Sequence, residues 1–124
     1  MENKTPSILI IDDDSRNVFA LSLVLSKKGY LCVSATDPHA GIKILQENNN
    51  IGVLLLDMMM PDMDGYEFIA NIKKDPALAQ LPIVAVTAQA MPGDSEKCLQ
   101  AGANAYVSKP VNIDLLLNIL KEYL

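Results

Sequence analysis

The chain has 124 residues, of which 50% are apolar and 20% charged, and its net charge is −5 at neutral pH. A chain of this size can bury enough surface to fold without disulfides or a structural metal, so we expect one domain over residues 1–124 with a core at about 7–123. The acidic balance argues against nucleic acid or an anionic membrane as a partner, because both attract clustered Lys and Arg. The apolar runs are far shorter than the roughly 20 residues of a membrane span, and the first residues lack a secretory signal, which together predict a cytoplasmic protein.

Five short apolar runs alternate along the chain with longer segments of helical period. The runs predict strands at residues 7–11, 30–35, 52–56, 82–87 and 103–107. Most of them are apolar throughout rather than at every second residue, as in parallel strands that are covered on both faces. Helices must provide that cover.

The first three predicted helices carry recognisable start or stop signals. The first covers 15–28 and is followed by Gly29, a frequent residue just past a helix end. The second begins after Asp37, which has proline at the next position, and the third begins at Asp64, which has Glu67 three residues later. These pairs are typical of capped helix N-termini.

The last two predicted helices complete the alternation. The fourth covers roughly 92–100 and stops before Gly102, and the fifth begins at Asn112. One face of the fifth helix is apolar at Ile113, Leu116, Leu117 and Leu120.

Strands that alternate with helices predict right-handed crossovers and an α/β fold. We expect a flavodoxin-like, doubly wound, five-stranded parallel sheet with strand order 2-1-3-4-5 and five helices. In such sheets the functional site lies at the carboxyl ends of the strands, where the strand order reverses. Here the reversal falls between the first and third strands.

Acidic residues follow both strands that meet at this reversal. The first strand leads into Asp12, Asp13 and Asp14, and the third leads into Asp57. Clustered carboxylates raise the pKa of one another unless a cation neutralises them, and an all-oxygen donor set favours Mg²⁺. The alternative is that residues 12–14 form a solvated turn that caps the first helix, and for Asp14 this alternative is at least as good as a functional role.

The fourth and fifth strands also lead into polar residues. Thr87 ends the fourth strand, and Ser108, Lys109 and Pro110 follow the fifth. A hydroxyl and an ammonium group are therefore expected at the same edge of the sheet as the acids.

In this arrangement the chain closely resembles the receiver domains of two-component response regulators, including the chemotaxis regulator and the receivers of hybrid sensor kinases. The resemblance covers nearly the whole chain. It rests on four motifs in order: Ile-Leu-Ile-Ile-Asp-Asp at 8–13, Leu-Leu-Leu-Asp-Met-Met-Met-Pro-Asp-Met-Asp-Gly at 54–65, Val-Thr-Ala at 86–88 and Tyr-Val-Ser-Lys-Pro at 106–110.

The resemblance implies a phosphoacceptor site. Asp57 would accept a phosphoryl group from the phosphohistidine of a sensor histidine kinase or a histidine phosphotransfer protein. Mg²⁺ would be bound by Asp13, by Asp57 and by the backbone carbonyl of Met59, and by Asp12 through a water. Lys109 would pair with the phosphoryl group and Thr87 would donate a hydrogen bond to it.

The resemblance also implies a switch. Thr87 would move toward the phosphoryl group, Tyr106 would turn inward, and the face formed by the fourth and fifth strands and helices would change shape. The alternative for Tyr106 is an ordinary half-buried tyrosine. Met59 and Gln89 would tune the attack of water on the phosphoryl group. Such a protein catalyses only its own phosphorylation and dephosphorylation and is not a turnover enzyme.

Other classes of protein fit the residues less well. A phosphohydrolase would use Asp12 and Asp14 as nucleophile and acid, but Ser15 stands where such enzymes usually have glycine, and Asp57 would have no role. A flavin protein is disfavoured, because three acids after the first strand would repel the flavin phosphate. A receiver-like interaction module that is never phosphorylated usually lacks a key residue, and none is missing here. We expect either a free-standing regulator or a receiver from a longer protein.

Overall fold

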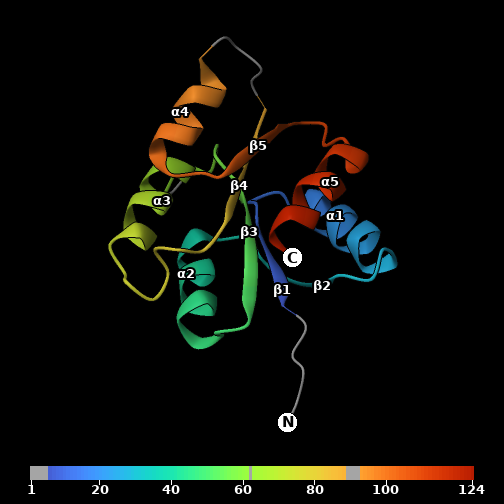
Figure 1. Cartoon of the computed structure of the whole chain (residues 1–124), viewed down its shortest axis with the longest axis horizontal. Helices are drawn as coiled ribbons and strands as arrows, with labels where there is room; N and C mark the ends of the chain where they lie inside the picture. Colours follow the sequence, from blue (N-terminus) through green and yellow to red (C-terminus); the bar gives the residue numbers. More distant parts are fainter. Residues whose placement is uncertain (1–5, 62, 89–92) are drawn as a thin grey trace.

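The computed structural model describes residues 6–61, 63–88 and 93–124, in which strands and helices alternate (Figure 1). The strands are β1 (Ser7–Ile11), β2 (Leu31–Ala35), β3 (Ile51–Asp57), β4 (Ile83–Thr87) and β5 (Ala105–Ser108). The helices are α1 (Ser15–Lys27), α2 (Pro38–Glu47), α3 (Gly65–Lys73), α4 (Asp94–Ala101) and α5 (Ile113–Tyr123). None of the helices within these ranges has both the length and the apolar character that crossing a membrane requires.

The five strands form one parallel sheet in the order β2-β1-β3-β4-β5. This order confirms the predicted fold class and the predicted topology. The order reverses between β1 and β3, where Ile11 lies opposite Leu56. The residues that follow these two positions, Asp12 and Asp57, are therefore neighbours at the carboxyl edge of the sheet.

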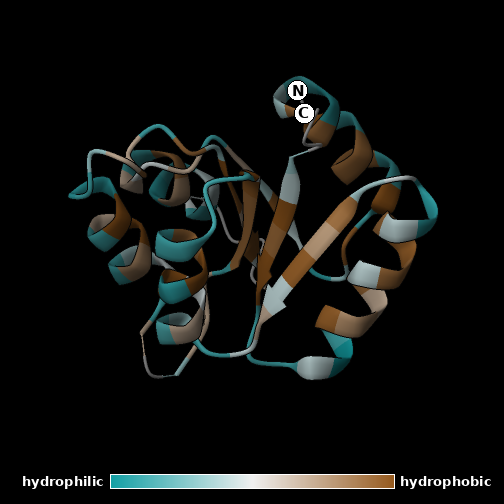
Figure 2. Ribbon diagram, turned by 90° about the horizontal axis from the view of Figure 1, so that it is seen from below, coloured by the Kyte–Doolittle hydropathy of each residue, from teal (hydrophilic) through white to brown (hydrophobic). Residues whose placement is uncertain are grey.

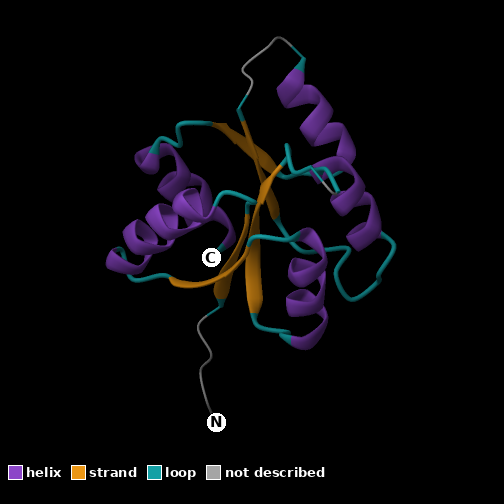
Figure 3. Ribbon diagram, turned by 180° about the vertical axis from the view of Figure 1, so that it is seen from behind, coloured by secondary structure: helices purple, strands orange, loops and turns teal. Residues whose placement is uncertain are grey.

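Alternate residues of the strands face two different sets of helices. Ile8 and Ile10 of β1 belong to a buried cluster with residues of α1 and α5, whereas Leu9 and Ile11 belong to a second cluster with residues of α2, α3 and α4. Figures 1 and 3 show these two sets on opposite faces of the sheet. In Figure 2 the strands are mainly hydrophobic, and the hydrophilic residues lie mainly on the helices and loops around them. Cover on both faces explains why the strands are apolar throughout.

The predicted helix N-caps are confirmed at three positions. The side-chain oxygen of Asp64 accepts a hydrogen bond from the Glu67 N–H, with 2.9 Å between the two atoms. The same kind of bond is made by Asp37 to His39 and Ala40 and by Asn112 to Leu115. Each cap satisfies backbone N–H groups that have no partner inside the helix.

Several predicted boundaries are wrong by one or two residues. Strand β2 begins at Leu31 rather than residue 30, and β5 covers Ala105–Ser108 rather than 103–107. In both places the preceding helix ends at a glycine with positive φ, and the next residue still bonds back to that helix. The Tyr30 N–H donates to the Leu25 carbonyl, and the Ala103 N–H donates to the Cys98 carbonyl. Tyr30 and Ala103 are apolar, so the sequence pattern assigns them to the strands although they close the preceding helices.

The other boundaries differ for smaller reasons. Helix α1 ends at Lys27, one residue early, and β4 begins at Ile83, one residue late. Strand β3 is one residue longer than predicted at each end, so Asp57 is its last residue rather than the residue after it. Helix α4 is described from Asp94, and the predicted start at residue 92 lies outside the described residues.

The segment after β3 is held from two sides. The Met58 N–H donates to the Val86 carbonyl with 2.9 Å between the atoms, and the Met58 carbonyl accepts from the Gly65 N–H at 3.2 Å. A Cβ at position 65 would lie 2.7 Å from the Met58 Cα, so only glycine allows α3 to begin this close to the backbone. Sheet and helix together position the residues that follow Asp57.

Leu116 and its neighbour Leu115 provide a matched test of how α5 packs. Leu116 is fully buried against the sheet and Leu115 is 48% exposed. We expect Leu116→Ala to lower the free energy of unfolding by about 2–5 kcal/mol, because it leaves a cavity in the core. Leu115→Ala should lower it by no more than about 0.5 kcal/mol in urea denaturation. Equal losses in the two variants would contradict the orientation of α5.

Candidate functional site

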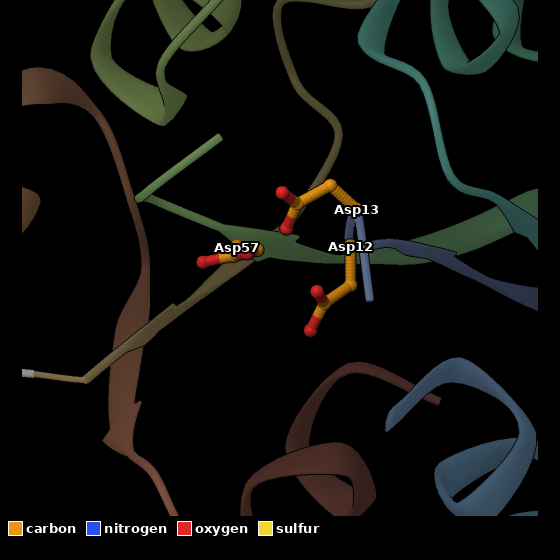
Figure 4. Close-up of side chains that lie close together, drawn as sticks. All are labelled: Asp12, Asp13 and Asp57. Atoms are coloured by element: carbon orange, nitrogen blue, oxygen red, sulfur yellow. The ribbon is translucent and has the colours of Figure 1, made fainter. Parts of the chain in front are cut away.

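Three carboxylates meet where the strand order reverses (Figure 4). Asp12 and Asp13 follow β1 and Asp57 ends β3, and one oxygen from each side chain lies within 4.8 Å of the others. Asp12 and Asp57 are 3% and 2% exposed, whereas Asp13 is exposed. The predicted convergence of these acids is therefore present. Two of the three negative groups are held away from solvent.

Lys109 reaches the two buried acids from the other side of β3. It follows β5, and its backbone N–H donates to the Thr87 carbonyl at 2.8 Å. Its Nζ lies 3.2 Å from Asp12 Oδ2 and 3.5 Å from Asp57 Oδ2. The peptide bond from Lys109 to Pro110 is cis. One ammonium thus contacts both buried carboxylates.

The remaining oxygen of each buried acid is oriented by a backbone N–H group. Asp57 Oδ1 accepts from the Met59 N–H at 3.0 Å, and Asp12 Oδ1 accepts from the Asp14 N–H at 2.9 Å. Each carboxylate therefore has one oxygen fixed by its own loop and one that faces Lys109. Neither side chain is free to turn without losing a hydrogen bond or an ion pair.

Burial and charge both act on the ionisation of this group. Burial raises the pKa of Asp57 to about 6, and the Asp12 charge adds to the rise, while the Met59 N–H and Lys109 oppose it. Burial alone would lower the pKa of Lys109, but Asp57 and Asp12 raise it above its ordinary value. Lys109 therefore stays charged, and a single ammonium must offset several carboxylates.

The donor set fits a hard divalent cation. All three side chains offer carboxylate oxygens, and Asp13 is exposed, which leaves room for water on that side. Mg²⁺ prefers oxygen ligands and usually keeps several waters when a protein binds it. A second positive charge would also favour the ionised form of Asp57, whose pKa is raised by burial and, to a smaller extent, by the Asp12 charge.

The other described residues that were singled out in the sequence differ in their exposure. Thr87 is the last residue of β4 and is 6% exposed, while Tyr106 lies on β5 and is 43% exposed. Met59 is 54% exposed. Gln89 lies outside the described residues. Asp14 caps α1 by accepting from the Arg16 N–H, as the capping alternative for this residue predicted.

The sequence analysis did not identify an apolar cavity beside the acids. The cavity has a volume of about 450 Å³ and lies between α1 and residues 109–113, with Asp12 and Lys109 in its wall. On α1, Phe19 is 69% exposed and Leu23 is 46% exposed. These two residues do not line the cavity, but the sequence shows them one turn apart and off the apolar stripe of α1, which consists of Val18, Leu21 and Leu25, so an exposed apolar pair on α1 could have been predicted.

A doubly wound sheet with an acidic cluster and a lysine at its reversal point is the arrangement of a receiver domain. The chain belongs to the response regulator receiver domain family, whose model matches residues 8–121. It is therefore a receiver domain of two-component signalling. Members of this family bind Mg²⁺ at an acidic pocket and interact with histidine kinases or phosphotransfer proteins.

The chain is similar to individual response regulators and receivers in both sequence and structure. The chain is 30% identical over 120 residues to the polar-differentiation response regulator DivK of Brucella ovis, covering 97% of each chain. It is 34% identical over 122 residues to the sensor histidine kinase RcsC of Escherichia coli, covering 98% of this chain and 12% of that protein. The chemotaxis protein CheY4 of Vibrio cholerae superimposes with a TM-score of 0.88 at 26% identity, covering 98% of this chain and 100% of that chain.

The raised pKa of Asp57 predicts how the stability of the metal-free protein depends on pH. The pKa is about 6 in the folded chain against an ordinary value of 3.8, so between these values the folded state binds more protons than the unfolded state. The stability that this proton provides is fully present at pH values below 3.8, the ordinary pKa of the group. It is lost as the pH rises through about 6, the pKa of Asp57 in the folded chain. In a chelator near neutral pH, Asp57→Asn should therefore be more stable than the wild type by about 1–3 kcal/mol.

Urea denaturation at a series of pH values measures this difference, which should shrink as the pH falls toward the ordinary pKa of an aspartate. Glu122→Gln, at an exposed position near the end of α5, controls for the loss of one negative charge. If Asp57→Asn has the same stability as the wild type throughout, the buried carboxylate carries no electrostatic penalty.

Proposed function

We propose that this chain is the phosphoacceptor switch of a phosphorelay, in which Asp57 accepts a phosphoryl group from a phosphohistidine. The donor is a sensor histidine kinase or a histidine phosphotransfer protein. The observation that carries the proposal is the environment of Asp57. Its carboxylate is 2% exposed and is contacted by the Met59 N–H on one oxygen and by the Lys109 ammonium on the other.

In the transfer step, a carboxylate oxygen of Asp57 attacks the phosphorus atom. The P–N bond of the phosphohistidine breaks, and its electron pair stays on the imidazole ring. The transition state of phosphoryl transfer is loose, so positioning and charge neutralisation provide most of the catalysis. Lys109 supports both, because its Nζ already lies 3.5 Å from Asp57 Oδ2, next to the position of the incoming group.

The acidic cluster supports a role for Mg²⁺ in this step. Asp13, Asp57 and the Met59 carbonyl would bind the ion directly, and Asp12 would bind it through a water. When bound, the ion offsets the negative charge of the phosphoryl oxygens. The convergence of three carboxylates within 4.8 Å, with one ammonium between two of them, is what supports a further cation.

The phosphoryl group would be the signal, and its hydrolysis would end that signal. Water attacks the phosphorus atom, the P–O bond to Asp57 breaks, and the carboxylate and inorganic phosphate are released. Met59 and Gln89 would tune this attack. While the group is present it adds nearly two negative charges at the end of β3.

The residues around Asp57 support a conformational response to that charge. The buried Thr87 hydroxyl would donate a hydrogen bond to a phosphoryl oxygen, and Tyr106, now 43% exposed, would turn inward. This would reshape the face formed by β4, α4, β5 and α5. A differential interaction of a few kcal/mol is enough to shift two pre-existing states in this way.

The apolar surface beside the site supports an approach route for the donor. A phosphohistidine must come close to Asp57, and the cavity between α1 and residues 109–113 shares Asp12 and Lys109 with the acidic cluster. Phe19 and Leu23 present apolar area on α1, beside the helix residues that line this cavity. We infer that the donor protein packs an apolar surface over this part of α1.

Intact mass measurement tests the transfer to Asp57. With Mg²⁺ and a small phosphodonor such as acetyl phosphate, the wild type should gain one phosphoryl group, about 80 Da, and Asp57→Asn should gain none. Replacing Mg²⁺ by a chelator should abolish the gain, and Lys109→Ala should reduce it at least tenfold, because a positive charge is lost beside the reacting atoms.

Two outcomes would contradict the proposal. If the wild type gains no mass at saturating donor, the chain is an interaction module rather than a phosphoacceptor. If Asp57→Asn still gains the group, another residue is the acceptor.

The donor route is tested by comparing two kinds of donor. Phe19→Ala should slow phosphoryl transfer from a phosphohistidine protein about tenfold, because it removes an exposed aromatic contact of the complex, and should leave the reaction with acetyl phosphate unchanged. Leu31→Ala is the matched control, because Leu31 is 51% exposed but lies at the opposite, amino end of β2. Equal effects of Phe19→Ala on both donors would remove the docking role of α1.

A further inference from the structure

Three consecutive methionines follow Asp57, and they differ in their exposure to solvent. Met58 and Met60 are 2% and 4% exposed and pack in the core, whereas Met59 is 54% exposed. Met63 is partly buried, and its sulfur accepts a hydrogen bond from Asn71 Nδ2 at 3.5 Å. An oxidant in solution therefore reaches the Met59 sulfur much more easily than the sulfur of either neighbour.

Met59 also stands at the open side of the acceptor site. Its backbone N–H binds Asp57 Oδ1 at 3.0 Å, so the residue is tied to the acceptor carboxylate. Asp57 and the neighbouring Asp12 are buried, whereas Met59 and Asp13 are exposed. Asp13, which belongs to the acidic cluster, and Met59, which is bonded to it through its backbone, are both reached by solvent.

We propose that Met59 is an oxidation site, at which peroxide converts the thioether to a sulfoxide and thereby shortens the lifetime of the phosphoryl group on Asp57. The effect on lifetime rests on the proposed function of Asp57, but the modification itself does not. The sulfoxide would couple the signalling state of the receiver to oxidants.

The modification is a two-electron oxidation with hydrogen peroxide as the co-reactant. A lone pair of the Met59 sulfur attacks one peroxide oxygen, the O–O bond breaks, and an S–O bond forms. The departing hydroxide takes up the proton left by the transferred oxygen and leaves as water. Sulfur is oxidised, peroxide is reduced, and a sulfoxide reductase can reverse the change.

The sulfoxide changes what Met59 offers to water. A thioether sulfur is only a weak hydrogen-bond acceptor, so it does little to orient a water molecule near the phosphorus atom. A sulfoxide oxygen is strongly polar and accepts hydrogen bonds well. An acceptor at this position can hold the attacking water by one of its protons, which favours attack on the phosphorus atom.

The first measurement concerns the modification alone. The full chain is exposed briefly to dilute hydrogen peroxide and mapped by peptide mass spectrometry, in which each sulfoxide adds about 16 Da. Met59 should be oxidised at least tenfold faster than Met58 and Met60, as their burial requires. Equal oxidation of the three residues in a chain that keeps its native circular dichroism would overturn the proposal.

The second measurement concerns the lifetime. Wild-type protein, oxidised or not, is phosphorylated with acetyl phosphate and freed of donor, and the loss of about 80 Da is followed with time. Oxidation should shorten the half-life about fivefold, the effect of one ordinary hydrogen bond. In Met59→Leu, peroxide should leave the half-life of that variant unchanged. Met63→Leu, which keeps Met59, should respond to peroxide as the wild type does.

A third variant tests whether a polar side chain at position 59 is enough to shorten the half-life, without other effects of peroxide on the protein. Met59→Gln places an amide oxygen at the same position and should shorten the half-life without any peroxide. If oxidised and unoxidised wild type lose the phosphoryl group at the same rate, the inference is wrong although the proposed function stands. If neither form takes up the group, the proposed function fails, while the peptide map still decides whether Met59 is the oxidation site.

Discussion

The burial of carboxylates at the carboxyl edge of the sheet is the constraint on which the site depends. The strand order reverses between β1 and β3, and this reversal brings Asp12 and Asp57 together in a buried position. Burial raises the pKa of Asp57, and the nearby Asp12 charge adds to the rise. Lys109 offsets part of this rise from the end of β5, with its Nζ 3.2 Å and 3.5 Å from the two acids. The remaining negative charge and the oxygen donors fit a hard divalent cation.

Much of this arrangement could be predicted from the sequence, and the reasons are local. Strands that are buried on both faces must be apolar throughout, and parallel strands must bring their carboxyl ends to one edge. The sequence could therefore predict that Asp12, Asp13, Asp57 and Lys109 come together, and that Thr87 lies at the end of β4. The helix starts at Asp37, Asp64 and Asn112 could also be predicted. The side chains of these residue types accept backbone N–H bonds at a helix N-terminus, so the residue type alone indicates the cap.

What could not be predicted depends on contacts between distant segments. The ends of β2 and β5 were misplaced because Tyr30 and Ala103 are apolar residues that close a helix rather than open a strand. The orientation of the Asp57 oxygens depends on a loop hydrogen bond and on a lysine from another strand. Met58, Met59 and Met60 are identical in sequence, so their exposure could not be predicted from residue type. Packing against α3 and the sheet buries Met58 and Met60 and leaves Met59 exposed. The cavity beside α1 likewise exists only once residues 109–113 lie against that helix.

The attachment of Met58 on both sides has a consequence for how a signal leaves the site. Its N–H is bound to β4 and its carbonyl to the first residue of α3, where even a methyl group would not fit. The peptide next to the acceptor therefore acts as a fixed reference point that an added group cannot push inward or along the strand. The Lys109 side chain, by contrast, contacts Asp57 through its ammonium group alone. In a receiver built in this way, a group added to Asp57 would meet a backbone tied to both β4 and α3, so a response to it would begin in side chains and not in this peptide.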